Sequence, residues 1–136
     1  MKQSSVYYLS VSDVLDIHEI VLIHGEDPGV LKPGELDAAI IAVQATFDGA
    51  PLLGTLAEVA AAYVFYLNRS HVFMDGNKRT SLVTALLFLE ANGFKLDTRR
   101  IDWLSIVAGV VAHRVSQADL VMFFAEAMGT PGEIEW

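Results

Sequence analysis

The sequence contains no cysteine in its 136 residues, so it has neither a disulfide framework nor a metal site built from thiolates. It also lacks a long hydrophobic run. Every stretch of about 18 residues contains a charge or a helix breaker, and we therefore expect no membrane span. No hydrophobic segment follows the first few residues, which predicts that there is no signal peptide. Together these absences favour a cytosolic protein.

Basic residues are scarce as well, with nine Lys and Arg against 17 Asp and Glu, for a formal net charge of −8. Most of the imbalance lies in residues 1–68, where nine acidic and two basic residues give −7. Binding to duplex nucleic acid without sequence preference needs a basic face, so the acidic composition argues against that class of protein. Arg69, Lys78 and Arg79 nevertheless fall within eleven residues, a spacing that suits one small anion better than a polyanion.

Apolar residues, in contrast, make up 53% of the chain, enough for a sizeable buried core. A length of 136 residues is typical of one domain, so we expect a single domain over residues 1–136. The apolar residues recur at helical spacing almost throughout, which predicts an all-α fold, a single compact bundle of about six helices. With their cap residues, the expected helices cover residues 10–25, 35–47, 55–68, 77–92, 102–114 and 116–129, with a short extended piece at 94–96.

Several of these helices have recognisable start signals. Ser10, Thr55 and Ser116 are each followed three residues later by Asp or Glu, which is the capping-box pattern. The alanine-rich helix from residue 55 should lie centrally, and the leucine-rich helix from residue 77 should be deeply buried. His18 and His24 lie six residues apart and do not share a helix face, so we expect no metal site in the first helix.

Residues 71–80 interrupt the helical pattern with the sequence His-Val-Phe-Met-Asp-Gly-Asn-Lys-Arg-Thr. Packing alone does not account for so many polar side chains at the mouth of a buried helix. The start of a helix carries unpaired N–H groups and the positive end of the helix dipole, which together attract an anion. Gly76 lets the backbone approach a phosphate, and Lys78 and Arg79 add positive charge at the same place.

Asp75 and His71 complete a set of residues for phosphate-transfer chemistry. A single carboxylate beside phosphates is typical of a Mg²⁺ ligand, because this ion takes one or two carboxylates plus substrate oxygens. The imidazole of His71 can accept a proton from a hydroxyl group near neutral pH. The residues favour transfer of a phosphate-containing group from a nucleotide to an alcohol. Simpler interpretations stay open at this stage, with Asp75 or Asn77 as the helix N-cap and Lys78 and Arg79 as a solvated pair.

This motif resembles the signature of the Fic/Doc (Fido) superfamily in its Doc, or "death on curing", variant. The matching residues are His71, Phe73, Asp75, Gly76, Asn77, Lys78 and Arg79. The Fic form typically reads H-x-F-x-[DE]-G-N-G-R-x-x-R. This chain has Lys78 and Leu82 in place of the second glycine and the second arginine, as Doc-type toxins do. Val83 is a further departure, since the prototype Doc toxin has an asparagine there. The resemblance covers roughly residues 7–96 and implies a Fido-type bundle, in which the motif loop leads into a buried central helix.

The resemblance also implies an activity. Fic proteins usually transfer AMP from ATP to a target hydroxyl. Doc toxins resemble them but are protein kinases, which move the γ-phosphate of ATP to a threonine of elongation factor Tu and so block translation. Because Leu82 cannot bind phosphate, we favour a Doc-like toxin with kinase activity. A Fic-type AMP (nucleotidyl) transferase and a catalytically silent binding module of the same fold are the alternatives.

The family pattern implies a role for each residue of the motif. His71 is the general base, Asp75 is the ligand of Mg²⁺, and Phe73 is the apolar anchor that seats the loop in the core. The phosphate of ATP, the co-substrate, is bound by Gly76, Asn77, Lys78 and Arg79.

A Doc-type toxin further implies an antitoxin similar to Phd, whose disordered tail folds as a helix in a groove on the toxin. Some Fic proteins are instead silenced by an internal helix with an [ST]-x-x-x-E-[GN] motif, but no Glu of this chain precedes Gly or Asn. The acidic first half predicts a groove with an acidic rim, which fits an amphipathic partner helix with basic flanks. A purely solubilising acidic surface is the alternative.

Overall fold

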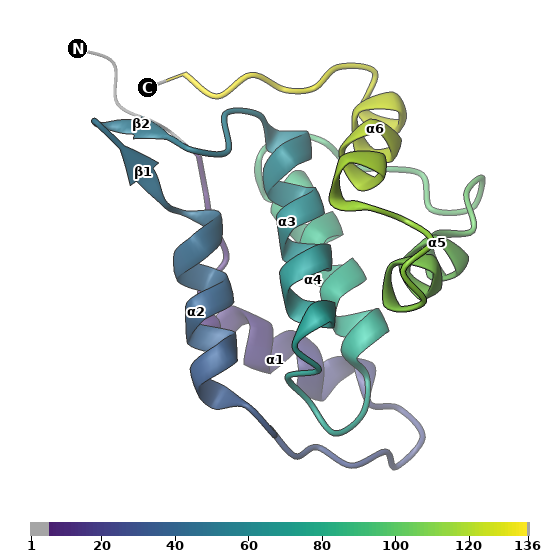
Figure 1. Cartoon of the computed structure of the whole chain (residues 1–136). Helices are drawn as coiled ribbons and strands as arrows, with labels where there is room; N and C mark the ends of the chain where they lie inside the picture. The colour runs from purple at the N-terminus through teal and green to yellow at the C-terminus, as the bar shows by residue number, and fades with distance from the viewer. Residues whose placement is uncertain (1–5, 136) are drawn as a thin grey trace.

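Helix α3 runs through the middle of the structure, a computed structural model that describes residues 6–135 (Figure 1). Ten of its fourteen residues are buried, and four of the ten are alanines, whose small side chains let neighbouring helices approach closely. It packs against α2, α4, α5 and α6, while α1 lies against α2 and α4. The six helices are α1 (Val11–Val21), α2 (Pro33–Val43), α3 (Leu56–Arg69), α4 (Asn77–Ala91), α5 (Trp103–Val111) and α6 (Gln117–Met128). The prediction of a mainly helical bundle is confirmed.

The contact between α3 and α4 lies at the centre of the hydrophobic core. The rings of Tyr63 and Phe88 meet there with their centroids 5.4 Å apart. The Tyr63 hydroxyl donates to the Leu9 carbonyl at 3.1 Å and accepts from the Leu9 N–H at 2.9 Å, which ties the segment before α1 to α3. Burial raises the pKa of Tyr63, so the phenol keeps the proton that it donates.

The predicted helix starts are largely present. Ser10 and Ser116 each form a reciprocal capping box with the Asp three residues later. Thr55 caps α3 by accepting from the Glu58 N–H at 3.1 Å. The Glu58 carboxylate, however, accepts from the Thr55 hydroxyl at 3.0 Å, so the expected box is present only on the Thr side.

The expected helix over 35–47 was wrong at its end, because α2 stops at Val43 and a short antiparallel hairpin follows. Its strands are β1 (Thr46–Phe47) and β2 (Ala50–Pro51). Asp48 (φ +53°) and Gly49 (φ +83°) form the two-residue turn between them. A turn of this kind needs positive φ at both positions, and Asp-Gly is a preferred sequence for it. The fold is therefore helical with one small hairpin.

Other predicted ends also shift. α5 stops at Val111 rather than near 114, because His113 takes a left-handed conformation (φ +60°) and the Arg114 N–H donates to the Gly109 carbonyl at 2.7 Å. This is the hydrogen bond of a Schellman helix end. Within residues 6–135 the piece at 94–96 forms no strand, and none of the helices combines the length and the hydrophobicity of a membrane span.

α1 likewise ends at Val21, four residues before the predicted stop at Gly25. Leu22 leaves the helical conformation at ψ 83°, and residues 22–32 then run across the loop between α3 and α4. The early end of α1 thus supplies the chain that covers the predicted motif.

Candidate active site

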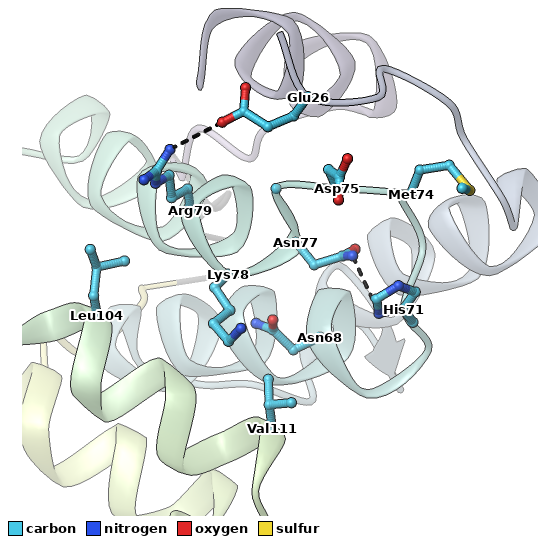
Figure 2. Close-up of a pocket in the computed structure, with 11 residues that line it drawn as sticks. Glu26, Asn68, His71, Met74, Asp75, Asn77, Lys78, Arg79, Leu104 and Val111 are labelled. Atoms are coloured by element: carbon cyan, nitrogen blue, oxygen red, sulfur yellow. Dashed lines mark hydrogen bonds and ion pairs between the residues drawn. The ribbon is translucent and has the colours of Figure 1, made fainter. Parts of the chain in front are cut away.

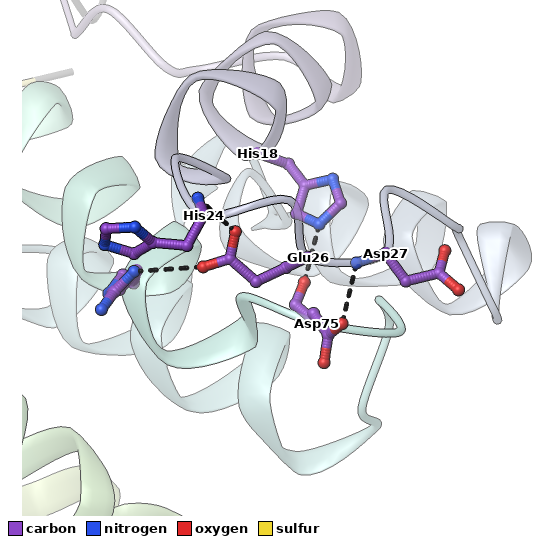
Figure 3. Close-up of polar contacts among 6 residues, drawn as sticks. His18, His24, Glu26, Asp27 and Asp75 are labelled. Atoms are coloured by element: carbon purple, nitrogen blue, oxygen red, sulfur yellow. Dashed lines mark hydrogen bonds and ion pairs between the residues drawn. The ribbon is translucent and has the colours of Figure 1, made fainter.

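The loop between α3 and α4, residues 70–76, is seated in the core on its inner side. The side chains of Val72 and Phe73 are completely buried. The Phe73 ring stacks on the ring of His18 in α1, with centroids 3.8 Å apart and planes inclined by 12°. His18 also donates from Nε2 to the Asp75 carbonyl at 2.8 Å (Figure 3). α1 therefore contacts the loop both through a ring stack and through a hydrogen bond.

Sequence reasoning missed this role of His18. The side chain is 3% exposed, and no group of three or more His, Asp or Glu suited to a metal ion occurs within residues 6–135. A signal for its burial was present in the sequence. Val14, His18 and Val21, with Ile17, follow the i, i+3, i+4, i+7 spacing that places residues on one helix face. That spacing puts His18 on the buried face of α1.

Asn77, the first residue of α4, holds the loop in a closed ring of hydrogen bonds. Its Oδ1 accepts from the Phe73 N–H at 2.9 Å, and its Nδ2 donates to the Phe73 carbonyl at 2.8 Å. These two bonds fix which amide atom is oxygen and which is nitrogen. The Asn77 side chain, which is 9% exposed, is thus engaged with the loop rather than open to a ligand.

Gly76 is the N-cap of α4 and has a left-handed conformation with φ +83°. This conformation favours glycine, and a Cβ here would also lie only 3.0 Å from Cδ2 of Leu22, which would have to shift. The first hydrogen bond of α4 runs from the Thr80 N–H to the Gly76 carbonyl at 2.9 Å. The N–H groups of residues 77–79 precede it and are those that a helix leaves without an internal partner.

The connection between α1 and α2 covers one side of this loop. The Leu31 N–H donates to the Val72 carbonyl at 2.8 Å, and the Met74 N–H donates to the Gly29 carbonyl at 2.9 Å. These are the hydrogen bonds of an irregular two-stranded pairing. Residues 29–31 therefore hold the backbone of the loop at residues 72–74.

Asp75 also receives a hydrogen bond from this connection. Its Oδ2 accepts from the Asp27 N–H at 2.9 Å (Figure 3), while the residue itself is exposed. A carboxylate has about four acceptor positions, so this bond leaves most of its capacity for a cation. The side chain can hold a metal ion without giving up its contact with Asp27.

A pocket of about 480 Å³ opens where the motif loop meets α4 and α5 (Figure 2). Its lining residues come from four parts of the chain: Glu26, Asn68, His71, Met74, Asp75, Gly76, Asn77, Lys78, Arg79, Leu104 and Val111. Six of the seven residues predicted from the motif are among them. The seventh, Phe73, lies beneath the loop in the core.

The charges in the pocket are only partly paired. Nη1 of Arg79 lies 3.6 Å from Oε1 of Glu26, and both side chains are partly exposed (Figure 2). Hydrogen bonds from its own N–H and from that of His24 lower the pKa of Glu26, with a smaller contribution from Arg79. Lys78 is exposed on the same turn of α4 as Arg79. The start of α4 is therefore cationic, with one carboxylate facing its arginine.

His71 lies at the rim of the pocket in an unusual backbone conformation, with φ +49°. Such conformations are uncommon outside glycine and occur often at functional sites. Its Nδ1 lies 3.4 Å from Nδ2 of Asn77 (Figure 2). Because an amide nitrogen only donates, this contact is a hydrogen bond only in the tautomer that has its lone pair on Nδ1.

Five lining residues have no part in the predicted motif. Glu26 comes from the α1–α2 connection, Asn68 from the last turns of α3, Met74 from the loop itself, and Leu104 and Val111 from α5. Only Asn68 gave a sequence signal, as an amide on a helix whose neighbouring positions are mostly alanine and aromatic. Met74 lies within the motif loop, whereas Glu26, Leu104 and Val111 reach the pocket through tertiary packing.

Sequence comparisons relate the chain to a known family. The model of the Fic/DOC family matches residues 8–89, from the segment before α1 to the last turns of α4. The chain is 37% identical over 90 residues to "Protein kinase doc" of Escherichia phage P1, and the aligned part covers 65% of this chain and 71% of that protein. It is 40% identical over 89 residues to "Toxin Doc" of Mycolicibacterium smegmatis, and the aligned part covers 65% of this chain and 67% of that protein. The family match includes every residue of the motif and stops before α5.

Proposed function

Because the chain belongs to the Fic/DOC family, we propose that it is a Doc-type toxin that transfers the γ-phosphoryl group of ATP to a hydroxyl of a protein. The observation that carries the proposal is the convergence of six motif residues on one pocket at the start of α4. Two Doc proteins, one of them named a protein kinase, are 37% and 40% identical to the chain over 65% of its length.

The phosphates would bind at the start of α4. The free N–H groups of its first turn and the positive end of its dipole attract an anion, and Lys78 and Arg79 add two cations there. Gly76 shapes the turn that presents these N–H groups. The Asn77 side chain is taken up by Phe73, so its contribution to phosphate binding would come through its backbone N–H.

A Mg²⁺ ion fits the residues present, with Asp75 as its protein ligand. Mg²⁺ prefers oxygen ligands and is commonly bound by one or two carboxylates plus substrate phosphates and water. Asp75 offers one exposed carboxylate, and within residues 6–135 no cluster of three acidic or His residues would hold the ion without a substrate. The ion would neutralise phosphate charge and reverse the repulsion between Asp75 and the nucleotide.

His71 would serve as the general base. The substrate hydroxyl gives its proton to Nδ1 of His71 as its oxygen bonds to the γ-phosphorus, and the bond from that phosphorus to the β–γ bridging oxygen breaks. ADP then leaves with the electron pair of that bond. Asn77 orients the ring through a contact of 3.4 Å, which is long enough to open when a substrate hydroxyl arrives.

Burial of Leu82 supports phosphoryl rather than AMP transfer. In Fic enzymes the corresponding arginine helps hold the outer phosphates. Here Leu82, in α4, is 8% exposed and packs in the hydrophobic core. AMP transfer would therefore lack one phosphate anchor. A threonine of elongation factor Tu is the target that the resemblance to Doc suggests, and block of translation is the expected result.

The test of this reaction uses ATP labelled on either the α- or the γ-phosphate, with a bacterial lysate and then with purified elongation factor Tu. We expect label from the γ position alone, and only with Mg²⁺ present. Label from the α position would contradict the kinase and select AMP transfer. No transfer from either position, together with unaltered growth on expression, would select a catalytically silent module.

We also propose a Phd-like antitoxin as the partner that silences the toxin. The net charge of −7 over residues 1–68 supports a partner helix with basic flanks, because opposite charges speed association. Expression alone should then stop growth, and co-expression with the neighbouring small open reading frame should restore it. A monodisperse, non-toxic protein purified without any partner would contradict this proposal.

A further inference from the structure

The side-chain amide of Asn68 is a polar group in the pocket wall that the proposed reaction does not use. Its Nδ2 donates to the Val64 carbonyl at 2.7 Å and to Oγ of Ser81 at 2.6 Å, and that hydroxyl donates to the Lys78 carbonyl at 2.9 Å. Asn68 is 7% exposed, and its Oδ1 has no hydrogen-bond partner among the described residues. In the view of Figure 2 the amide lies beside the tip of the Lys78 side chain and above Val111.

The orientation of this amide is fixed. Both hydrogens of Nδ2 are used, and the Val64 carbonyl can only accept, so a flipped amide would set two oxygens against each other. A buried carbonyl oxygen without a partner is unfavourable, and such groups are rare in folded proteins. Asn68 is thus a rigid acceptor, positioned by Ser81, at the edge of the pocket.

The donor that suits this acceptor is not a phosphate. Ionised phosphate oxygens only accept hydrogen bonds, and the start of α4 already provides donors for them. The donors of a nucleoside triphosphate are all on its nucleoside, as ribose hydroxyls and, in adenine, an exocyclic amine. Leu104 and Val111 on α5, exposed to 47% and 46%, add apolar surface to the same pocket, which suits the face of a base.

We propose that Asn68 and the exposed face of α5 form the nucleoside end of the pocket, where Asn68 Oδ1 accepts a hydrogen bond from a ribose hydroxyl or the base amine. The inference rests on the proposed function, because it assumes that the phosphates lie at the start of α4. It assigns to α5, which lies beyond the range of the family match, a part in nucleotide selection.

Oδ1 is closed off from solvent in this structure, so the side chains around it must move before a nucleoside can reach it. Lys78 is exposed, and its backbone carbonyl accepts a hydrogen bond from the Ser81 hydroxyl. Its side chain runs beside the Asn68 amide in Figure 2. A phosphate at the start of α4 would draw the Lys78 ammonium toward itself. The same movement would open the space beside the amide for the nucleoside.

Calorimetric titration of the full chain with Mg²⁺ present tests this assignment. The ligands are ATP, 2′-deoxy-ATP, 3′-deoxy-ATP, purine riboside triphosphate without the amine, and inorganic triphosphate. In Asn68→Ala we expect ATP to bind about three- to tenfold more weakly, the range of one hydrogen bond, and inorganic triphosphate to bind as before. One analogue lacks the group that donates to Asn68. Its affinity should be the same for Asn68→Ala as for the wild type, by the logic of a double-mutant cycle.

The matched control is Asn92→Ala. The Asn92 side chain also donates to two backbone carbonyls at a helix end, those of Phe88 and Tyr7, but lies outside this pocket. Its loss should leave ATP affinity unchanged. This control separates a local contact from a general loss of stability.

Several outcomes would overturn the assignment. Equal ATP affinity in Asn68→Ala and the wild type would refute it while leaving the proposed function in place. Equal weakening of ATP and inorganic triphosphate would also refute it, because Asn68 would then act through Lys78. If Asn68→Ala does not fold, equal wild-type affinity for ATP and all three analogues would overturn it. Wild-type protein that binds neither ATP nor triphosphate would refute the proposed function as well.

Discussion

The two sides of the motif loop lie in opposite surroundings. On the inner side, Phe73 and Asn77 are buried and bonded to the scaffold, with His18 stacked beneath them. On the outer side the side chains are exposed and line the pocket: His71, Asp75, Lys78 and Arg79. The inner residues determine where the backbone lies, and the outer ones meet solvent or a ligand. Substitutions on the inner side should therefore reduce stability, and those on the outer side should change activity at unchanged stability.

His71→Ala should give the largest effect on the outer side. Loss of a general base lowers the transfer rate by about 10²- to 10⁴-fold. The exposed side chain makes one long contact, so the melting temperature should stay close to that of the wild type. Transfer of γ-labelled phosphate and a thermal melt measure the two quantities.

Two further variants sharpen this test. His24→Ala removes an exposed histidine of the α1–α2 connection that does not line the pocket, and should leave the rate unchanged. His71→Asn retains a residue that tolerates the positive φ but cannot act as a base, so it should be as inactive as His71→Ala. Activity retained in His71→Asn would assign the histidine a conformational role.

Phe73→Ala should give the largest effect on the inner side. Removing a completely buried phenylalanine costs about 3–5 kcal/mol of folding free energy, and here it also removes the stack on His18. Urea denaturation measures the loss. Phe47→Ala, at a position that is 76% exposed on the hairpin, is the control and should be close to neutral. A loss below about 1 kcal/mol in Phe73→Ala would contradict the role of the inner side.

Asn77→Asp tests the hydrogen-bonded ring at nearly constant size. The new carboxylate would keep the acceptor for the Phe73 N–H but would place an oxygen against the Phe73 carbonyl. We expect a loss of about 1–3 kcal/mol in unfolding free energy at pH 7.

The same variant has a distinctive pH dependence. A carboxyl group facing a carbonyl favours its protonated form, so its pKa is raised in the folded state. The variant's stability relative to the wild type should therefore recover as the pH falls through that raised pKa, because the protonated group can donate again. A loss that is constant between pH 7 and pH 4.5 would contradict this account.

The helices and the motif could be predicted from local sequence patterns. The helices were predictable because apolar periodicity and capping residues act within one or two turns, as at Ser10 and Ser116. The motif was predictable because its residues are contiguous. The hairpin was missed because Asp48-Gly49 suits both a helix end and a two-residue turn, and only the pairing partner distinguishes them.

The distant walls of the pocket were not predictable in the same way. Leu104 and Val111 lie on a helix whose apolar pattern indicates burial, and only its placement beside α4 exposes them to the pocket. His18 gave a signal of burial but none for its contact with Phe73. Glu26 gave no signal, since a carboxylate in a polar loop is usually solvated. Contacts between segments far apart in sequence depend on the tertiary packing.

Glu26→Gln should give the smallest effect on activity. It tests the ion pair between Glu26 of the α1–α2 connection and Arg79 in the pocket. The Glu26 carboxylate faces Arg79 at 3.6 Å and so competes with phosphate for the guanidinium. The amide keeps an oxygen to accept from the His24 N–H, as Glu26 does at 2.8 Å, but removes the charge. Exposed ion pairs are weak, so KM for ATP should fall only about two- to fivefold, and the difference should fade at high salt. Glu19→Gln, on the exposed surface of α1 outside the pocket, should change nothing. A higher KM in Glu26→Gln would show instead that the carboxylate positions Arg79 for the nucleotide, which would place Glu26 with the residues that build the site.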